Sequence, residues 1–461
     1  MCNLRFIEVY AMSFRVLLPK NFEFCAQALR YLYWYSYPLE SLPLNFWPKN
    51  LVELHMRFNN LKQLWNGGDK PLGSLKLMDL SYSYRLIRIP NLSSIAPNLE
   101  FLYLEGCKSL VETPSLQNLS KLTELYLNGS NKIKDCPEIP CNIRILKLYG
   151  TGIKQLPSSI KHLSQLVILS LDGCTLLSLP SSIGNLKRLE ELHLAECLLV
   201  TIPSNIGELK CLEKLFLRNC SYLASLPESI KQLSKLKLLD LRDCESLKSL
   251  PELPSCLKFL KAIDCHSLES ASISFNFNCT FLDFSHCFKL NKKVMEDVFE
   301  AHLLGQKVTL LMAGGEVPEW MRYKNKGSSL SFKLHLRHVI AFSFCVVLSP
   351  YGDVYFPGFE VDFICESGNR REHNAFNLFS DKDVANWNGY PYLSDLSHVL
   401  LSFNGLRTRF DEECFVEASF CFNTDYYMDR PEIMECGVHP IYSRDKRRSR
   451  NEKHQDDEEC Q

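Results

Sequence analysis

Leucine and isoleucine recur along the first half of the chain in the frame LxxLxL, whose first, fourth and sixth positions are apolar. The frame begins at Leu4, Leu29, Leu51, Leu75, Leu99, Leu122, Ile143, Leu166, Leu189, Leu212, Leu236 and Leu257, with 21 to 25 residues from one start to the next. Alternation of apolar and polar residues over such a short segment is typical of a β-strand with one buried face. The pattern therefore predicts one short strand in every repeat, with the leucines on its inner face.

This frame and period together are the signature of a leucine-rich repeat, in which each unit contributes one strand and one return segment. A single unit cannot bury its apolar face alone, so successive units must stack. We expect a solenoid over residues 1–270, built from about twelve repeats around a parallel β-sheet curved like a horseshoe. Such a protein offers its partners an extended surface rather than a deep pocket.

The return segments share a second pattern, [LI]-P-x-x-I-x-x-L, which is clearest at residues 156–163, 179–186, 202–209 and 226–233. Proline fixes the backbone angle φ and lacks an amide donor. Each connection is also too short for a long helix. We therefore expect irregular backbone or a single 3₁₀ turn on the convex side, opposite the strands.

The third, fifth and seventh positions of each frame point away from the leucines, because side chains alternate along a strand. Aromatic residues and arginines are frequent there, and both are enriched where proteins bind one another. The candidate partner-binding residues are Tyr31, Tyr33, Tyr35, Arg57, Phe101, Tyr103, Tyr126, Tyr149, Arg218 and Arg242. We expect the aromatic residues to form one stripe. The alternative is that these rings only pack across neighbouring strands, for which aromatic residues have a high propensity.

Six cysteines occupy one fixed position, three residues after the end of the frame. They are Cys107, Cys174, Cys197, Cys220, Cys244 and Cys265, and other repeats place Asn59, Ser83, Ser130 or Thr151 there. A small polar side chain at this position turns inward and can bond to the backbone of the adjacent coil. We expect a ladder of buried, reduced thiols. Metal binding is the alternative, but thiols stacked one strand spacing apart cannot surround an ion tetrahedrally.

The repeat frame ends near residue 270, and different patterns follow it. The phenylalanine-rich residues 271–290 are expected to form a connection that closes the apolar end of the solenoid. Apolar spacing predicts one amphipathic helix over residues 292–304.

Beyond the helix, alternating residues predict strands at 329–334, 340–348, 360–365, 399–403 and 415–422. Because no helices separate these strands, residues 271–442 are expected to form an antiparallel, jelly-roll-like β-sandwich. Trp387 lies in a polar loop of this region. Its ring either folds inward as a plug or projects as a further partner contact.

Five motifs then occur in a fixed order: LRFIEVY (4–10), LRYLYWYSYPLESLP (29–43), NLVELHMRFNNLKQLW (50–65), GGEVPEWMRYKNKGSSLSFKL (314–334) and ECGVHPIY (435–442). Together they resemble the C-terminal half of plant TIR-NB-LRR disease-resistance proteins, over roughly residues 1–442. The last two motifs are similar to the C-JID domain that follows the repeats in that family. The resemblance implies that repeats and C-JID domain together bind a pathogen effector or a guarded host protein, and that a full-length receptor of this family is a further candidate partner.

The sequence lacks two features of that family. It contains no G-x-x-x-x-G-K-[ST] phosphate loop, and no α/β domain similar to a TIR module precedes the repeats. We therefore expect no nucleotide or other cofactor, and we interpret the chain as a truncated product or a piece of a longer one. No G-x-S-x-G, H-E-x-x-H or cysteine-protease motif occurs either, so we do not expect an enzyme.

Two other interpretations stay open. An intracellular leucine-rich scaffold or adaptor of the plant Ras-group type would share the return segments, but not the last two motifs. A receptor ectodomain would account for the N-x-[ST] sequons at Asn91, Asn118, Asn128 and Asn278. The absence of a signal-peptide pattern at the start of the sequence argues against the ectodomain.

Charge and hydropathy limit the classes of partner and the cellular compartment that we expect for this chain. The 52 basic and 53 acidic residues give a net charge of −1, which provides no general attraction to nucleic acid. No apolar run approaches the ~20 residues that span a bilayer, so we expect a cytoplasmic protein. Residues 443–461 are densely charged and are expected to be disordered. The basic block DKRRSR (445–450) in this tail is a candidate nuclear-import signal.

Overall fold

The computed structural model describes residues 3–10, 27–66, 70–113, 115–273, 281–350, 352–353, 358–365, 371–377, 392–393, 397–405, 415–423 and 432–443. Trp387 and the predicted tail from residue 444 onward lie outside this part of the chain. The chain divides into two compact units, Met1–Leu236 and Lys237–Gln461, which we call unit 1 and unit 2. The domain boundary expected at residue 270 stays a prediction.

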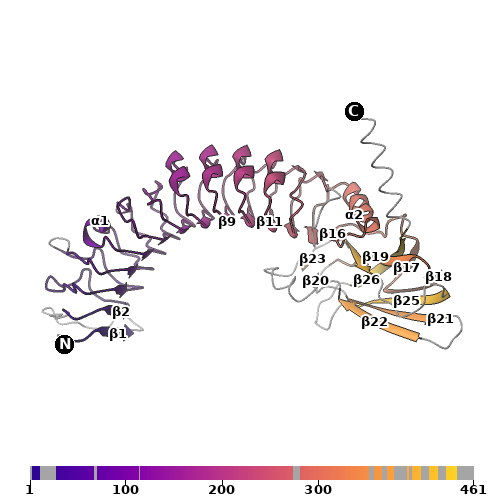
Figure 1. The fold of residues 1–461 in the computed structure, drawn as a ribbon, viewed down its shortest axis with the longest axis horizontal. Coiled ribbons are helices and arrows are strands. Elements are labelled where there is room, and N and C mark those ends of the chain that lie inside the picture. The colour runs from indigo at the N-terminus through magenta and orange to yellow at the C-terminus, as the bar shows by residue number, and fades with distance from the viewer. Residues whose placement is uncertain are drawn as a thin grey trace. The chain divides into compact units, whose positions relative to one another are not determined.

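Unit 1 is a ladder of short parallel strands, one from each repeat (Figure 1). The strands are β1 (Phe6–Tyr10), β2 (Tyr31–Tyr35), β3 (Glu53–His55), β4 (Leu77–Asp79), β5 (Phe101–Tyr103), β6 (Glu124–Tyr126), β7 (Ile145–Lys147), β8 (Ile168–Ser170), β9 (Glu191–His193) and β10 (Lys214–Phe216). Frame leucines lie opposite one another, as Leu146, Leu169 and Leu192 do on β7, β8 and β9. All three side chains are fully buried. The leucine frame from Leu29 onward therefore forms the core, as predicted, whereas Leu4 of the first repeat is 45% exposed.

The cysteine position of the frame forms a second ladder inside the core. The Cys107 thiol donates to the Leu80 carbonyl at 3.4 Å, and the Cys197 thiol donates to the Leu171 carbonyl at 3.2 Å. Each acceptor is the last frame residue of the preceding repeat. Burial raises the pKa of the Cys107 thiol to about 12, so the side chain stays protonated. The six cysteines are buried and free, which confirms the predicted ladder of reduced thiols.

The proline-containing return segments form short 3₁₀ helices on the face opposite the strands (Figure 1). They are η1 (Ser158–His162), η2 (Ser181–Asn185), η3 (Ser204–Glu208) and η4 (Glu228–Gln232), and an earlier repeat has the short helix α1 (Leu92–Ile95) at this place. Pro157 precedes η1 with φ −71° and ψ 152°, an extended backbone that proline favours. The isoleucine of the pattern, such as Ile160, is buried under the strands. The predicted 3₁₀ turns are confirmed.

Unit 2 begins with a parallel ladder of its own. Its strands are β11 (Leu238–Asp240), β13 (Phe259–Lys261), β15 (Phe281–Phe284) and β16 (Thr309–Ala313), which pair in this order, while β12 (Ser249–Leu250) and β14 (Ser270–Ala271) pair separately. The segment expected to be only a closing connection, 271–290, thus contains β15, a strand of the repeat type. Cys287 follows it at the usual position and donates to the Ala262 carbonyl at 2.8 Å. His286 has the left-handed backbone, φ 61°, that Asp264 has one repeat earlier.

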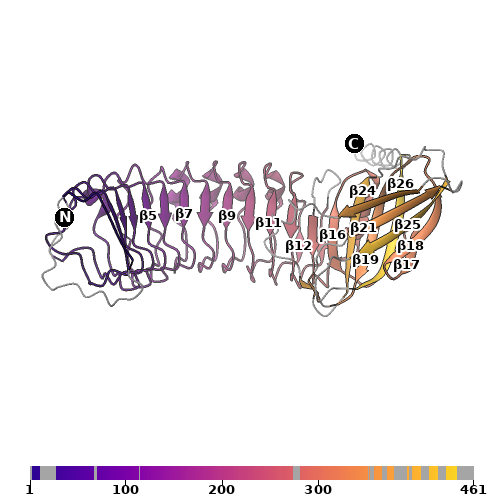
Figure 2. The same cartoon turned by 90° about the horizontal axis from the view of Figure 1, so that it is seen from below.

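The rest of unit 2 is an antiparallel β-sandwich (Figure 2). The helix α2 (Lys293–Leu303) precedes it, as predicted. One sheet pairs β16, β24 (His398–Gly405), β19 (Val339–Leu348), β26 (Ile433–Tyr442) and β17 (Tyr323–Lys326) in this order, and the other pairs β18 (Ser329–His335), β25 (Phe415–Asn423), β21 (Gly358–Cys365) and β22 (Arg371–Asn377). The short strands β20 (Gly352–Asp353) and β23 (Tyr392–Leu393) pair with each other.

Aromatic rings from both sheets fill the space between them. The rings of Phe344 on one sheet and Phe359 on the other lie 4.3 Å apart, and Phe342 meets Phe420 edge to face at 5.3 Å. Phenylalanine buries a large apolar area, and such ring pairs add to the stability of a core. Val361 and Phe363 of β21 point into this core, so the apolar face that alternation predicted for this strand is buried.

Candidate protein-binding face

The outward side chains of β1–β10 and of the residues just after them form one surface of unit 1, which we call the strand face. Its central row passes from strand to strand through Tyr33, His55, Asp79, Tyr103, Tyr126, Lys147, Ser170, His193 and Phe216. The predicted aromatic residues on this face are half-buried, except Tyr149, which is 46% exposed. The strand face therefore includes aromatic rings that keep part of their surface open to a partner.

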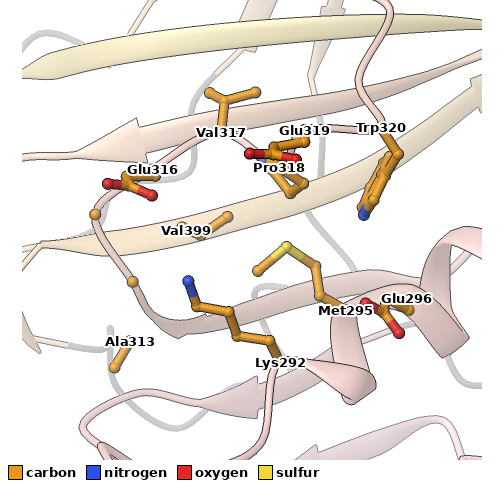
Figure 3. Close-up of a pocket in the computed structure, with 12 residues that line it drawn as sticks. Lys292, Met295, Glu296, Ala313, Glu316, Val317, Pro318, Glu319, Trp320 and Val399 are labelled. Atoms are coloured by element: carbon orange, nitrogen blue, oxygen red, sulfur yellow. The ribbon is translucent and has the colours of Figure 1, made fainter.

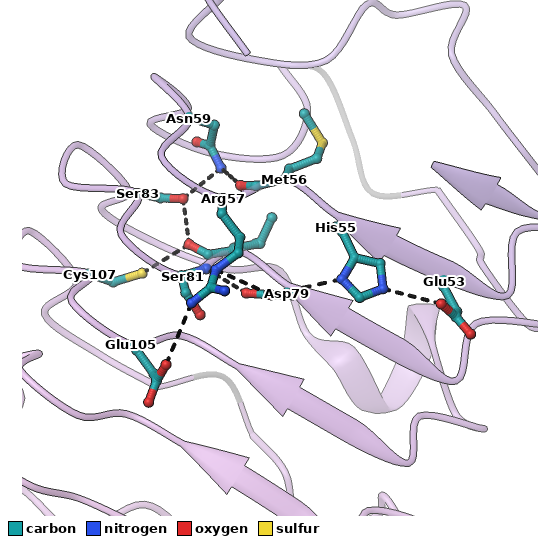
Figure 4. Close-up of polar contacts among 11 residues, drawn as sticks. Glu53, His55, Met56, Arg57, Asn59, Asp79, Ser81, Ser83, Glu105 and Cys107 are labelled. Carbon is teal, nitrogen blue, oxygen red and sulfur yellow. Dashed lines mark hydrogen bonds and ion pairs between the residues drawn. The ribbon is translucent and has the colours of Figure 1, made fainter. Parts of the chain in front are cut away.

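Polar contacts connect the N-terminal part of this face, and Figure 4 shows those from Glu53 on β3 to Glu105 just after β5. The Tyr33 hydroxyl donates to the Glu53 carboxylate at 2.7 Å, and the Tyr33 ring stacks on the His55 ring at 4.2 Å. His55 lies between two carboxylates, with Nε2 at 3.2 Å from Glu53 Oε2 and Nδ1 at 3.8 Å from Asp79 Oδ2. Arg57 continues the chain of charges, at 3.6 Å from Asp79 and 3.8 Å from Glu105. This connected set fixes the side chains before any partner arrives.

The electrostatics of this set favour a charged histidine. Burial opposes the charge of His55, but the contacts with Asp79 and Glu53 outweigh it and raise the pKa of the imidazole. Burial likewise opposes the charge of Asp79, but the nearby His55 imidazole and a hydrogen bond from the Ser81 amide lower the pKa of that carboxyl. Each shift favours the charged form of its group, and we call this set of contacts across β3, β4 and β5 the ion-pair ladder.

The predicted aromatic stripe is interrupted by this ladder. Tyr31, Tyr33 and Tyr35 lie on β2, whereas Phe101, Tyr103 and Tyr126 lie beyond Asp79 on β5 and β6. In the second group the Tyr103 and Tyr126 rings are 4.8 Å apart, and the Tyr103 hydroxyl donates to Glu124 at 3.0 Å. The expectation of one continuous stripe was wrong, because an aspartate occupies the central position of β4.

A second cluster of similar composition occurs on β8–β10, and none of its residues was among the predicted contacts. His193 contacts Glu191 at 3.1 Å and Asp172 at 3.8 Å, and its ring stacks on Phe216 at 4.4 Å. Lys214 pairs with Glu191 at 2.9 Å. The tripeptide Glu-Leu-His, which occurs at 53–55 and again at 191–193, is the signal that could have revealed both clusters.

The predicted arginines lie in different settings. Arg57 belongs to the ion-pair ladder, and Arg218 follows β10 with an exposed side chain. Arg242, in unit 2, makes a two-pronged contact with the buried Asp240, at 2.9 Å to Oδ1 and 2.6 Å to Oδ2. This contact raises the pKa of Arg242 and uses its Nε and Nη2 atoms as donors. Trp387 is outside the described residues, so its role as a contact stays a prediction.

Both the repeat region and the C-terminal region of the chain match models of known protein families. Residues 80–198 match the family model of a leucine-rich repeat region, and residues 50–67 match a single leucine-rich repeat. Residues 312–447 match the C-JID domain. The chain combines leucine-rich repeats with a C-JID domain. Both are recognition modules rather than catalytic domains.

The curated relatives of this C-JID-containing chain are plant disease-resistance proteins. It is 50% identical over 108 residues to disease resistance protein RPV1 of Vitis rotundifolia, a match covering 23% of this chain and 8% of the relative. It is 46% identical over 127 residues to disease resistance protein RML1B of Arabidopsis thaliana, covering 26% and 12%. The matches thus span about a tenth of the length of these relatives.

The solved structures that match the chain include two leucine-rich repeat proteins. The repeat domain of the type III effector XopL has a TM-score of 0.41 and 29% identity, covering 46% of this chain and 76% of that one. The Leptospira interrogans protein LIC12759 has a TM-score of 0.34 and 20% identity, covering 61% and 95%. Within the described residues of our chain, no helix has the length and apolar character needed to cross a membrane.

Proposed function

We propose that this chain is the protein-recognition part of a plant intracellular immune receptor, which binds a pathogen effector or a guarded host protein through the strand face and the C-JID region. The observation that supports this most is the presence in one chain of leucine-rich repeats and a C-JID domain, a combination typical of plant disease-resistance receptors. A full-length receptor of the same kind is a second class of partner. The compartment that fits this role is the cytoplasm, with the basic block at 445–450 as a candidate nuclear-import signal.

The geometry of the strand face supports a binding role on physical grounds. The hydroxyl groups of Tyr33 and Tyr103 each donate a hydrogen bond to a glutamate on the next strand, which restricts the ring before binding. Immobilising a flexible side chain at an interface costs about 0.5–1.5 kcal/mol, so rings that are already held lose less on association. Tyrosine is also among the residues that most often dominate binding energy. We therefore assign the central contacts to the two tyrosine groups on either side of Asp79.

The test begins with affinity purification of the whole chain from pathogen-challenged leaf tissue and identification of the captured protein by mass spectrometry. Binding of the purified partner is then measured by calorimetry for the wild type, Tyr103→Ala and Tyr222→Ala. Tyr222 is a matched control, because it is 60% exposed and follows β10 rather than lying on the strand face.

Tyr103→Ala should weaken binding by about 2 kcal/mol, or roughly thirtyfold, if Tyr103 is a central contact. Tyr222→Ala should leave the affinity unchanged, and both variants should keep nearly the wild-type melting temperature. Unchanged affinity in Tyr103→Ala, Tyr126→Ala and Tyr33→Ala would refute recognition by this part of the strand face.

A further inference from the structure

Unit 2 contains a pocket of about 610 Å³ that none of the strand-face arguments uses (Figure 3). It lies between the start of α2 and the loop that joins β16 to β17, residues 314–322. Met295 from α2 and Val399 from β24 supply an apolar floor, and both side chains are buried. The volume is in the range of pockets that hold small ligands or single side chains of a partner.

Strand β26 holds the loop that forms one wall of the pocket. Val317 and Met321 are buried anchors of this loop. The Val317 amide donates to the Glu435 carboxylate at 3.4 Å, and the His439 ring donates from Nδ1 to the Trp320 carbonyl at 3.1 Å. The absence of a side chain at Gly437 allows this packing, because a Cβ there would lie 2.6 Å from the Val317 side chain.

Contacts between aromatic rings also hold Trp320, which forms the aromatic wall of the pocket. The Trp320 ring stacks on Phe299 of α2 at 3.9 Å with an angle of 24° between the planes. Phe299 in turn meets the His439 ring edge to face at 5.0 Å. One part of the indole is thus covered by α2, while the residue as a whole remains half-buried and lines the pocket. The pocket is therefore formed before any ligand enters.

Charged side chains surround this apolar interior. Glu296, Glu316, Glu319 and Lys292 all line the pocket and are exposed. Three carboxylates against one ammonium group give a net charge of −2. None of the four side chains forms a hydrogen bond or ion pair with another residue in the described part of the chain. In the view of Figure 3 the Lys292 amine lies toward Glu316, whereas Trp320 and Glu296 lie at the other end.

We propose that this pocket binds an arginine side chain presented by a short segment of a protein partner. The methylene groups of arginine would cover Met295 and Val399, as long cationic side chains do on apolar surfaces. The guanidinium group would lie against the Trp320 ring, a contact that aromatic faces favour for cations.

Arginine fits the pocket better than lysine does. Its planar group can stack on an indole and pair with two carboxylates at once, whereas the lysine ammonium group is a compact point charge. Glu296 lies at the Trp320 end of the pocket in Figure 3, and Glu319 directly precedes Trp320 in the chain, so we assign these two carboxylates to the guanidinium group. The proposal concerns unit 2 alone and does not depend on partner binding by the strand face.

The experiment uses the full chain and two synthetic probes. The first is the acetylated peptide amide Gly-Leu-Arg-Leu-Gly, and the second replaces arginine by citrulline, which keeps the shape but removes the charge. Calorimetry should show saturable binding of the arginine peptide with a dissociation constant of about 1 mM, because one anchored side chain supports only weak affinity. The citrulline peptide should bind at least about tenfold more weakly. No saturable binding of the arginine peptide up to roughly 10 mM, or equal binding of the two peptides, would overturn the proposal.

Variants then locate the site. The double variant Glu296→Gln with Glu319→Gln should weaken binding of the arginine peptide about tenfold, since each exposed ion pair contributes modestly. Glu300→Gln is the matched control, because Glu300 is an exposed carboxylate of α2 that does not line the pocket. The control should bind like the wild type, and all variants should keep the wild-type melting temperature. Equal affinity in the double variant and the wild type would place the peptide elsewhere and overturn the assignment.

Discussion

Two leucines of one repeat, Leu169 and Leu177, allow a matched test of the frame that builds unit 1. Leu169 lies on β8 between Leu146 and Leu192 and is 0% exposed, whereas Leu177 lies in the following turn and is 60% exposed. The same substitution, leucine to alanine, therefore removes the same atoms from two different environments. The difference between the two variants therefore reports the loss of buried surface and the cavity left at Leu169.

The expected magnitude follows from the exposure of each side chain. Leucine to alanine removes three carbon atoms, and at about 0.8 kcal/mol for each buried methylene the transfer cost at Leu169 is about 2.4 kcal/mol. The cavity left in a tightly packed ladder increases this to about 3–5 kcal/mol. At Leu177, where most of the side chain already contacts water, the cost should stay under about 1 kcal/mol. We expect a difference of at least about 2 kcal/mol.

Urea unfolding of the full chain, followed by far-ultraviolet circular dichroism, provides the measurement. With a slope of about 2 kcal/mol/M, a difference of 2 kcal/mol separates the midpoints of the unit 1 transition by about 1 M. The slopes of the two variants should agree, because neither substitution changes the surface exposed on unfolding by much. Equal midpoints, or a lower midpoint for Leu177→Ala, would refute the register assigned to the repeats.

Three further predictions test other parts of the structure. The pKa of His55 is raised above its ordinary 6.5, so the charged imidazole stabilises unit 1 at low pH, and this stabilisation is lost as pH rises through the folded-state pKa. In His55→Gln the free energy of unfolding of unit 1 should therefore fall less steeply with rising pH than in the wild type. Equal slopes of unfolding free energy against pH in wild type and variant would contradict this. Gly314→Ala should lower the melting temperature of unit 2, because its Cβ would lie 2.8 Å from Val399, whereas Gly315→Ala, with the nearest atom at 4.0 Å, should not. Trp387→Ala should weaken partner binding without changing the melting temperature; a fall in melting temperature with unchanged affinity would instead make this ring a plug of the sandwich.

The sequence predicted those features that depend on local periodicity. Alternation along the strand placed Leu169 in the core, and a proline with a following isoleucine predicted the 3₁₀ turn at Ile160. The helix α2 and the alternating face of β21 were predicted in the same way. Periodicity works here because the local backbone decides on which side of its strand, turn or helix each residue lies, and packing of neighbouring elements then buries the apolar side.

Two features were harder to predict: a repeat with an irregular frame, and a contact between neighbouring repeats. The strand β15 escaped notice because Cys279 and Phe284 stand where the frame normally has leucine, although Cys287 keeps the cysteine position. Asp79 lies on the strand face yet is only 6% exposed. Its burial and its contacts with His55 and Arg57 come from neighbouring strands, and no single repeat contains that information.

The nearly constant spacing of the frames also affects how such a surface can change over evolutionary time. Insertion or loss of one whole repeat shifts every later frame by a full unit, so the leucines of β7 and β9 would still meet their counterparts across the junction. A duplication inside a globular core has no such tolerance, because it displaces residues whose partners are distant in sequence. Unequal recombination between neighbouring repeats can therefore add, remove or exchange rows of the strand face, such as the Glu-Leu-His row present on β3 and β9, without breaking the leucine register.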